Sequence, residues 1–488
     1  MKIRACTLIG VLCFCLSIQA AQPTEMPWRH GRLMVSANQR FLQHEDGTPF
    51  FWLGETPWLM PQRLTRDEVD YYMQVASKAG YNMVQVQVLN DVPSVNIYGQ
   101  LSHPYGWDMT KADPDGVYSY WDHLDYIIHS AERWGIYVGL VTIWGSQVKN
   151  CHINEEQGRE YAEFLAKRYG DSPNIIWILG GDIEGDIHPE VWQMMGATIK
   201  SIDHNHLMTY HPRGRTTSAK WFAEAEWIDF HTYQSGHRRY GQRMGSKTYP
   251  IPDDTEEDCW MYVDSTWSHR PVRPVIDDEP SYENIPKGLH DPDEGRWQAA
   301  DVRRYAYWDV FAGCCGHSYG HNSIMQMLKP GFPTGYGRNG EEPTWTEALD
   351  APGFQQMRIL KDLMLSFPYF ERIPDQSIIL GDNGTRYDRL IATRGDGYLM
   401  VYNYTSRPMD ISLKTISGKE KRLLWMDAAT GKLTVLGTTR SDAFHYEPPQ
   451  PKDREIADGV LIAVDTEMKF TGIFRNDNKI GHGTTNGR

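Results

Sequence analysis

The chain has 488 residues, of which 40% are hydrophobic and 23% are charged, and its formal net charge at pH 7 is −14. This length exceeds what one ordinary hydrophobic core holds, so we expect one large and one smaller domain in a soluble globular protein. The acidic balance argues against nonspecific binding to nucleic acid or to an anionic membrane surface.

The first 20 residues have the features of an export signal. Lys2 and Arg4 precede an apolar stretch over residues 5–18, and Ala20 and Ala21 offer small residues for cleavage. The stretch is too short to span a membrane well. We therefore expect a cleaved signal peptide over residues 1–20 and a secreted or periplasmic protein.

From about residue 49 to 325, apolar strand-like runs alternate with amphipathic helices. The clearest helix covers "LTRDEVDYYMQVASKAG", where Thr65 and Glu68 have capping-box spacing and Gly80 stands at a C-cap position. Similar helices end at Gly135 and Gly170. The candidate strands lie near residues 50, 84, 138, 176, 208, 229, 275 and 315.

Strands that alternate with helices in this way predict βα units, a parallel sheet and an α/β fold. Eight such units favour a (β/α)8 TIM barrel, to which we assign residues 21–372. An open doubly wound sheet is the competing fold, but no Gly-rich phosphate-binding loop follows the first strand.

The pattern changes after about residue 372, where short apolar runs follow one another without a long helix. Asp396-Gly397 separates two of these runs and is a hairpin signal. We expect residues 373–488 to contain a small antiparallel β-sandwich followed by a frayed tail. Its role should be structural, because no cluster of acids or exposed aromatic residues stands out in its sequence.

Four cysteines remain after the signal peptide, and their spacing matches no zinc template. They are Cys151, Cys259, Cys314 and Cys315. One disulfide suits an oxidising compartment, and four buried thiols are the alternative. We expect no metal and no cofactor, because the histidines near strand ends do not assemble into three or four ligands with recognisable spacing.

Two predicted strands end in carboxylates. The fourth, in "WILGGDIEGD", passes through Gly180 and Gly181 to Asp182, and the seventh leads to Glu279. Reactive residues of a barrel project from the C-terminal ends of its strands, so these carboxylates would share the mouth. Glycoside hydrolysis requires such a pair, with one group a protonated acid and the other an anion.

Neighbouring acids compete for both roles. Asp277, Asp278 and Glu283 are alternatives to Glu279, while Glu184 and Asp186 are alternatives to Asp182. An acid after a strand also commonly caps a helix or holds an arginine. Asp186 precedes "IHPE" and is placed to cap the following helix.

Aromatic and polar residues near the strand ends are candidates for binding sugars, because aromatic faces stack on sugar rings while Tyr and Trp still donate hydrogen bonds. The alternative is that they fill the core. The candidate substrate-binding residues are Glu55, Trp58, Trp144, Glu184, His211, Tyr233, Arg238, Arg239 and His317.

Several segments resemble glycoside hydrolase family 140, the apiosidases. "LMVSANQRFLQHEDGTPFFWLGETPW" and "YNMVQVQVL" are similar to the start of its barrel, and "GGDIEGD" and "VIDDEPSYE" to its catalytic segments. The C-terminal part, with "LLWMDAATGK", resembles the collagen-binding-type sandwich often appended to it. Many barrel glycosidases carry Asn-Glu at the end of strand four, where this chain has Gly-Asp.

The resemblance implies a retaining glycosidase that cleaves apiosyl linkages of the pectin rhamnogalacturonan II, with Asp182 as acid/base and Glu279 as nucleophile. Its partner would be an oligosaccharide or polysaccharide. Two other hypotheses about the function remain open. One is a β-1,4-glycanase of the cellulase or mannanase type, and the other is a non-catalytic carbohydrate-binding barrel.

An acidic protein needs a local basic patch to bind an acidic pectin. The loops after strands five and six provide candidates, namely Arg213, Arg215, Arg238, Arg239, Arg243 and Lys247. Arginine forks match carboxylates in a bidentate way, so these side chains could hold uronic acids beyond the cleaved bond. The alternative is a solvated loop that makes ordinary surface pairs.

Overall fold

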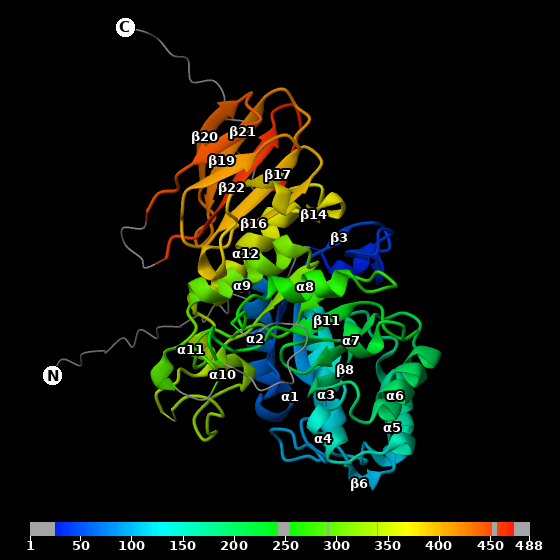
Figure 1. Ribbon diagram of the computed structural model, residues 1–488. Helices are drawn as coiled ribbons and strands as arrows, with labels where there is room; N and C mark the ends of the chain where they lie inside the picture. The colour runs from blue at the N-terminus through cyan, green and yellow to red at the C-terminus, as the bar shows by residue number, and fades with distance from the viewer. Residues whose placement is uncertain (1–24, 243–253, 290–291, 339, 451–455, 473–488) are drawn as a thin grey trace, which may run out of the picture.

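The computed structural model describes residues 25–242, 254–289, 292–338, 340–450 and 456–472 (Figure 1). The expected signal peptide and C-terminal tail, together with Arg243 and Lys247, lie outside these ranges. Within them, no helix is both long and apolar enough to cross a membrane.

The larger part of the chain is a nearly closed barrel of nine strands in the order β10-β11-β12-β13-β4-β5-β7-β8-β9. All neighbours pair in parallel except β10 and β11. The eight strands expected from the sequence are all present, so the TIM-like barrel is confirmed. Their bounds are β4 (Trp52–Glu55), β5 (Met83–Gln87), β7 (Tyr137–Val141), β8 (Ile175–Ile183), β9 (Met208–Pro212), β11 (His231–Gln234), β12 (Val275–Asp277) and β13 (Gly316–Tyr319), with β10 (Thr216–Thr217) as the addition.

The seam between β9 and β11 is closed largely by side-chain hydroxyls. Thr209 Oγ1 donates to Phe230 O at 2.7 Å, and Thr232 Oγ1 donates to Tyr210 O at 2.6 Å. These threonines are fully buried, so their hydroxyls need partners inside the protein. The bonds bring the loops after β9 and β11 together at the barrel mouth.

The helices start where the sequence places caps. Thr65 and Glu68 form the expected capping box of α2, while α6 starts at Pro189 after the left-handed His188, which has no side-chain cap. The expectation that Asp186 caps α6 is therefore wrong, because the N-cap is His188 and Pro189, three residues after Asp186, fixes the first helical turn. The longer helices are α2 (Arg66–Lys78), α3 (Tyr120–Arg133), α5 (Glu155–Tyr169), α6 (Pro189–Ile202), α8 (Trp260–Trp267), α9 (Ala299–Ala312) and α12 (Pro352–Leu365).

Short elements complete the barrel region. The short helices are α1 (Met60–Arg63), α4 (Gly145–Lys149), α7 (Ala219–Phe222), α10 (Asn322–Met325) and α11 (Trp345–Ala348). Strands outside the barrel are β1 (Leu33–Val35), β2 (Leu42–His44), β3 (Pro49–Phe50) and β6 (Pro104–Trp107). All four cysteines of the described chain are free thiols, and Cys151 is exposed, so the expectation of four buried thiols is wrong for that residue.

The C-terminal part is the expected antiparallel sandwich, with a six-stranded sheet in the order β14-β16-β17-β22-β19-β20 and a three-stranded sheet β15-β18-β21. Asp396-Gly397 turns between β16 and β17, and Gly397 has the positive φ (69°) of a tight turn. The bounds are β14 (Ile373–Pro374), β15 (Ile379–Leu380), β16 (Ile391–Gly395), β17 (Tyr398–Asn403), β18 (Met409–Ser412), β19 (Lys421–Asp427), β20 (Leu433–Thr439), β21 (Ala443–Tyr446) and β22 (Gly459–Asp465).

The central strands of the large sheet, β17 and β22, are buried on both faces. Along β17, Leu399 and Val401 face the sandwich core, while Met400 and Tyr402 join the core shared with the barrel. Tyr402 stacks on Tyr307 of α9 with ring centroids 4.6 Å apart. Figure 1 shows the sandwich, in orange and red, resting on α8, α9 and α12 of the barrel.

A buried ion pair joins the two parts. Arg303 of α9 makes a two-pronged contact with Asp458, with Nη2 2.6 Å from Oδ1 and Nε 3.0 Å from Oδ2. Tyr402 Oη donates to the same carboxylate at 3.0 Å. Both charged side chains are almost fully buried, so each depends on the other for compensation.

We expect Asp458→Ala to destabilise the protein by roughly 3–5 kcal/mol, because it leaves the buried Arg303 charge without an opposite charge. Asp410→Ala is the matched control, since Asp410 pairs with His445 on the exposed surface. It should leave the free energy of unfolding nearly unchanged. Urea titration of both variants measures this difference. Equal and small effects would contradict a stabilising interface.

Candidate active site

The end of β8 is built to project Asp182. Gly180 pairs with His211 of β9, but the next pairing joins Ile183 to Pro212, so two residues bulge out of the ladder. A Cβ on Gly180 would lie 2.3 Å from the carbonyl oxygen of His211. Only glycine fits there, and the bulge turns the Asp182 side chain towards the mouth.

The sequence-predicted pair, Asp182 and Glu279, lies in one cavity of about 180 Å³ at the C-terminal ends of the strands. Its lining comprises Asp182, Arg213, Gly214, Arg215, Gln234, Gly236, His237, Arg238, Glu279, Ile285, Leu289, Met325 and Tyr336. A larger hollow of about 340 Å³ lies at the opposite, N-terminal ends of β7 and β8. We place the active site in the smaller cavity, because there two carboxylates from different strands converge.

Glu279 is held as an anion by two histidines. His237 Nε2 lies 3.0 Å from Oε1 of Glu279, and His211 Nε2 lies 3.1 Å from Oε2. The Glu279 residue is only 8% exposed, and burial alone would raise its pKa. The contacts with the histidines outweigh burial and lower the pKa of Glu279 to about 2.

His211 is itself fixed from behind by Asp278. Its Nδ1 lies 2.8 Å from Asp278 Oδ2, and both side chains are fully buried. Burial acts to lower the pKa of His211, but the charges and hydrogen bonds of Asp278 and Glu279 raise it to about 10. His211 is therefore held as an imidazolium at neutral pH, with Nδ1 hydrogen-bonded to Asp278 and Nε2 in ion-pair contact with Glu279.

The pKa of Asp182 is shifted upward, in the opposite direction to that of Glu279. Desolvation in the mouth and the nearby charge of Glu279 raise its pKa to about 6, although the backbone N–H of Gly214 donates to Oδ1 at 3.2 Å. The residue nevertheless remains open to solvent from the mouth. One cavity thus holds a carboxyl that keeps its proton in mild acid and a carboxylate that does not.

Four of the predicted substrate-binding residues are buried among other groups of the protein. Glu55 is fully buried, accepts a hydrogen bond from Tyr72, and has its pKa raised to about 8 by desolvation. Tyr233 and His317 both bind the buried carboxylate of Asp309, at 2.7 and 2.9 Å. His211 lies beneath Glu279. All four side chains are buried and lie outside the cavity lining, so contact of a substrate with them stays a prediction that the structure does not support.

The two predicted tryptophans form an aromatic group at the edge of the site. Trp58 and Trp144 have ring centroids 5.8 Å apart and lie 5.4 and 5.8 Å from the His211 ring. Trp58 is buried and donates to Tyr282 Oη at 2.9 Å, whereas Trp144 is partly buried and packs against Gly181. Neither belongs to the cavity lining, so a sugar contact from these rings stays a prediction.

The structure separates the predicted arginines. Arg238 lines the cavity, where burial and the charges of Arg215 and Arg213 lower its pKa. Arg239 instead pairs with Glu294 at 2.7 Å and does not line the cavity. Likewise Glu184 is held by Arg213 outside the lining. Each of these two side chains is engaged by an opposite charge, and substrate contact by Arg239 and Glu184 stays a prediction.

His237 and Tyr336 are among the cavity residues that the sequence did not single out as candidates. His237 stands inside "SGHRRYG", where only the arginines drew notice. Tyr336 lies in the long segment after β13, and its phenol has its pKa raised by burial and by the charges of Glu279 and Asp182. No periodicity or motif marks Tyr336.

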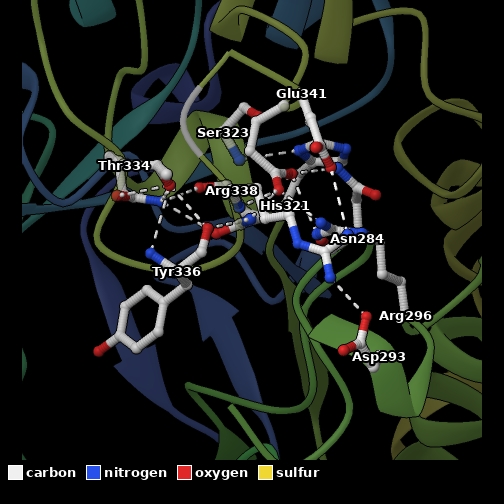
Figure 2. Close-up of polar contacts among 12 residues, drawn as sticks. Asn284, Asp293, Arg296, His321, Ser323, Thr334, Tyr336, Arg338 and Glu341 are labelled. Atoms are coloured by element: carbon white, nitrogen blue, oxygen red, sulfur yellow. Dashed lines mark hydrogen bonds and ion pairs between the residues drawn. The ribbon is translucent and has the colours of Figure 1, made fainter. Parts of the chain in front are cut away.

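The segment that carries Tyr336 is anchored by its backbone (Figure 2). Thr334 Oγ1 and Asn322 Nδ2 donate to Tyr336 O at 2.6 and 3.1 Å. Asn322 also contacts the buried Glu342, which Arg296 binds at 2.6 Å. The network leaves the Tyr336 ring pointing away from these contacts, as Figure 2 shows, so the ring forms a wall of the cavity.

Groups of three or more His, Cys, Asp or Glu side chains arranged to hold a metal ion do not occur in the described part of the chain. The two carboxyls that line the cavity, Asp182 and Glu279, can supply proton transfer and carboxylate attack. A pair of carboxyls with divergent pKa values is the arrangement that glycoside hydrolysis needs. The fold and the site together define a barrel of the glycoside hydrolase class.

Comparisons with known proteins agree. The family described as "Apiosidase-like, catalytic domain" matches residues 36–371, and a collagen-binding domain family of a collagenase matches residues 373–464. The chain belongs to the apiosidase-like family of glycoside hydrolases, which confirms the resemblance noted in the sequence.

Solved structures include close relatives. One described as "Glycoside hydrolase" is 53% identical with a TM-score of 0.88, covering 92% of this chain and all (100%) of its own. A glycoside hydrolase family 5 structure from Bacteroides vulgatus ATCC 8482 is 56% identical with a TM-score of 0.89, covering 92% and 96%. A "Probable mannan endo-1,4-beta-mannosidase A-2" of Aspergillus terreus is 23% identical over 197 residues, which is 35% of this chain and only 49% of that relative.

We expect His211→Asn to raise the pKa of Glu279 from about 2 towards the ordinary range of a glutamate, because its contact with the charged His211 ring is lost. Carbon NMR titration of labelled glutamates measures this, with the Glu279 signal identified by its absence in Glu279→Gln. His206→Asn is the control, since it removes a histidine paired with Asp203 at the other end of the barrel. An unchanged Glu279 titration in His211→Asn would contradict the account.

Proposed function

We propose that the protein is a retaining glycosidase that cleaves apiosyl linkages of the pectin rhamnogalacturonan II after export. The observation that carries the mechanism is the divergence of two carboxyl pKa values in one cavity, about 6 for Asp182 and about 2 for Glu279. The substrate rests on the family's description and on the sequence resemblance. Export rests on the signal-like N-terminus.

In the proposed mechanism Glu279 attacks the anomeric carbon while Asp182 donates its proton to the departing oxygen. The products are a covalent ester between the sugar and Glu279 and a free leaving alcohol. Asp182, now a carboxylate, then removes a proton from water, which attacks the anomeric carbon and releases the sugar. Because His211 and His237 stabilise the Glu279 carboxylate, they also favour its departure in the second step.

A β-1,4-mannanase is the second candidate, because a fungal protein of that name shares part of the sequence. The cavity argues against it. A volume of about 180 Å³ suits one small sugar better than a long chain of hexoses in an open cleft. A non-catalytic binding barrel is less well supported, since binding alone does not require two carboxyls with divergent pKa values.

Asp182→Asn and Glu279→Gln should each lower kcat on rhamnogalacturonan II oligosaccharides by roughly 10²–10⁴-fold while folding normally. Wild-type kcat/KM should fall as the pH rises through about 6, because Asp182 loses the proton that it must donate. Asp186→Asn, at an exposed acid outside the cavity, is the control. Product analysis by NMR also reports the configuration of the released sugar. Wild-type turnover in either site variant would refute the assignment.

Arg238 and Arg239 provide a matched test of substrate charge. If the leaving unit is acidic, Arg238→Ala should raise KM on that substrate about tenfold, because the cavity arginine can bind a carboxylate. The loss should shrink with added salt and on a small neutral apioside. Arg239→Ala should have little effect, since Arg239 is engaged by Glu294. Equal effects of both changes on both substrates would show that Arg238 does not recognise charge.

A further inference from the structure

The loop over residues 235–242, which follows β11, fixes one of the two partners of Glu279. Its His237 contacts Oε1 of Glu279 at 3.0 Å, and the backbone N–H of Gly236 donates to Glu279 O at 3.1 Å. The same loop places Arg238 in the cavity lining. A shift of this loop would therefore alter both the charge environment of Glu279 and the shape of the cavity.

The far end of the loop is anchored on the segment before α8. The backbone N–H of Tyr240 donates to Glu257 Oε1 at 2.9 Å, and its phenol donates to Asp258 Oδ1 at 2.6 Å. Gly241 N donates to Glu256 Oε2 at 3.0 Å. Tyr240 stands only three residues after His237, so its anchorage restrains the histidine.

The C-terminal sandwich reaches the same anchor. Tyr387 donates its hydroxyl to Glu257 Oε1 at 3.0 Å, the oxygen that also accepts from Tyr240. The Tyr240 and Tyr387 rings meet edge to face with centroids 5.3 Å apart, and the Arg386 guanidinium lies 4.9 Å over the Tyr240 ring. The sandwich thus contacts both the side chain of Tyr240 and the carboxylate that binds its backbone.

Glu257 is the shared acceptor of this cluster and is almost fully buried. Arg304 of α9 binds its second oxygen at 2.6 Å and lies 4.8 Å under the Tyr387 ring. Arg304 and Glu257 are core residues whose removal would disturb folding. Tyr387 and Arg386, in contrast, are exposed, with Tyr387 at 38%. Truncating them loosens the anchor while sparing the core.

We propose that Tyr387 and Arg386 of the C-terminal sandwich are positioning residues for the active-site loop 235–242, and through His237 for Glu279. The catalytic consequence rests on the proposed function, in which Glu279 is the nucleophile. The structural consequence, that these two residues hold the loop in place, does not depend on that function. The sandwich then has a role beyond stabilising the barrel, because it supplies part of the support on which the nucleophile depends.

The first measurement needs no substrate. Amide hydrogen exchange of the full-length protein should show peptides over residues 235–242 exchanging about tenfold faster in Tyr387→Ala, the effect of losing one hydrogen bond to a charged acceptor. Arg386→Ala should have a smaller effect, and Tyr387→Phe should lie between. Tyr446→Ala is the matched control, because Tyr446 packs on Trp425 in the sandwich, away from the loop. It should leave the exchange of 235–242 unchanged.

The second measurement is the pH profile of kcat/KM. In Tyr387→Ala the acid limb should move to higher pH, because a loosened His237 lowers the pKa of Glu279 less effectively. Tyr446→Ala should keep the wild-type limb, since a loss of general stability does not shift it. Unchanged exchange of 235–242 in Tyr387→Ala would overturn the proposal, and so would an unshifted acid limb. If the wild-type protein cleaved no glycoside at all, the proposed function would be refuted. The hydrogen-exchange result would still show whether Tyr387 holds the loop 235–242 in place.

Discussion

The contact between Glu279 and its two histidines is the interaction on which the rest of the site depends. A buried carboxylate is costly unless charges and hydrogen bonds replace the water it loses. His211 comes from β9, His237 from the loop after β11, and Glu279 from the end of β12. The contact therefore exists only because the barrel brings these strand ends together. It also keeps Glu279 charged, and this charge adds to desolvation in raising the pKa of Asp182.

Specific contacts of the scaffold hold the groups around Glu279 in position. The glycine bulge of β8 fixes the direction of Asp182, while Asp278 holds His211 from the core side. The sandwich covers α9 and contacts the anchor of the loop that carries His237. The barrel and the sandwich, which share a core across their interface, thus both support one cavity.

Sequence reasoning found the parts that follow from periodicity and from glycine chemistry. The eight strands were predictable because strands covered on both faces become apolar runs, and Asp182 stood out because two glycines precede it. It did not foresee the buried partners of Glu55, Tyr233 and His317, since a position at a strand end does not show whether a polar side chain is already bound inside the protein. It missed Tyr336 and the role of His237, because contacts between distant loops leave no local pattern.

The proposed mechanism depends most on Glu279 being the nucleophile beside the proton donor Asp182. A glycoside with fluorine at C2 and a good leaving group slows release of the covalent intermediate more than its formation. Intact-protein mass spectrometry followed by peptide mapping would then locate the trapped sugar. We expect one sugar per chain, attached as an ester to Glu279. A label on another residue, or none when the activated glycoside is consumed, would contradict it.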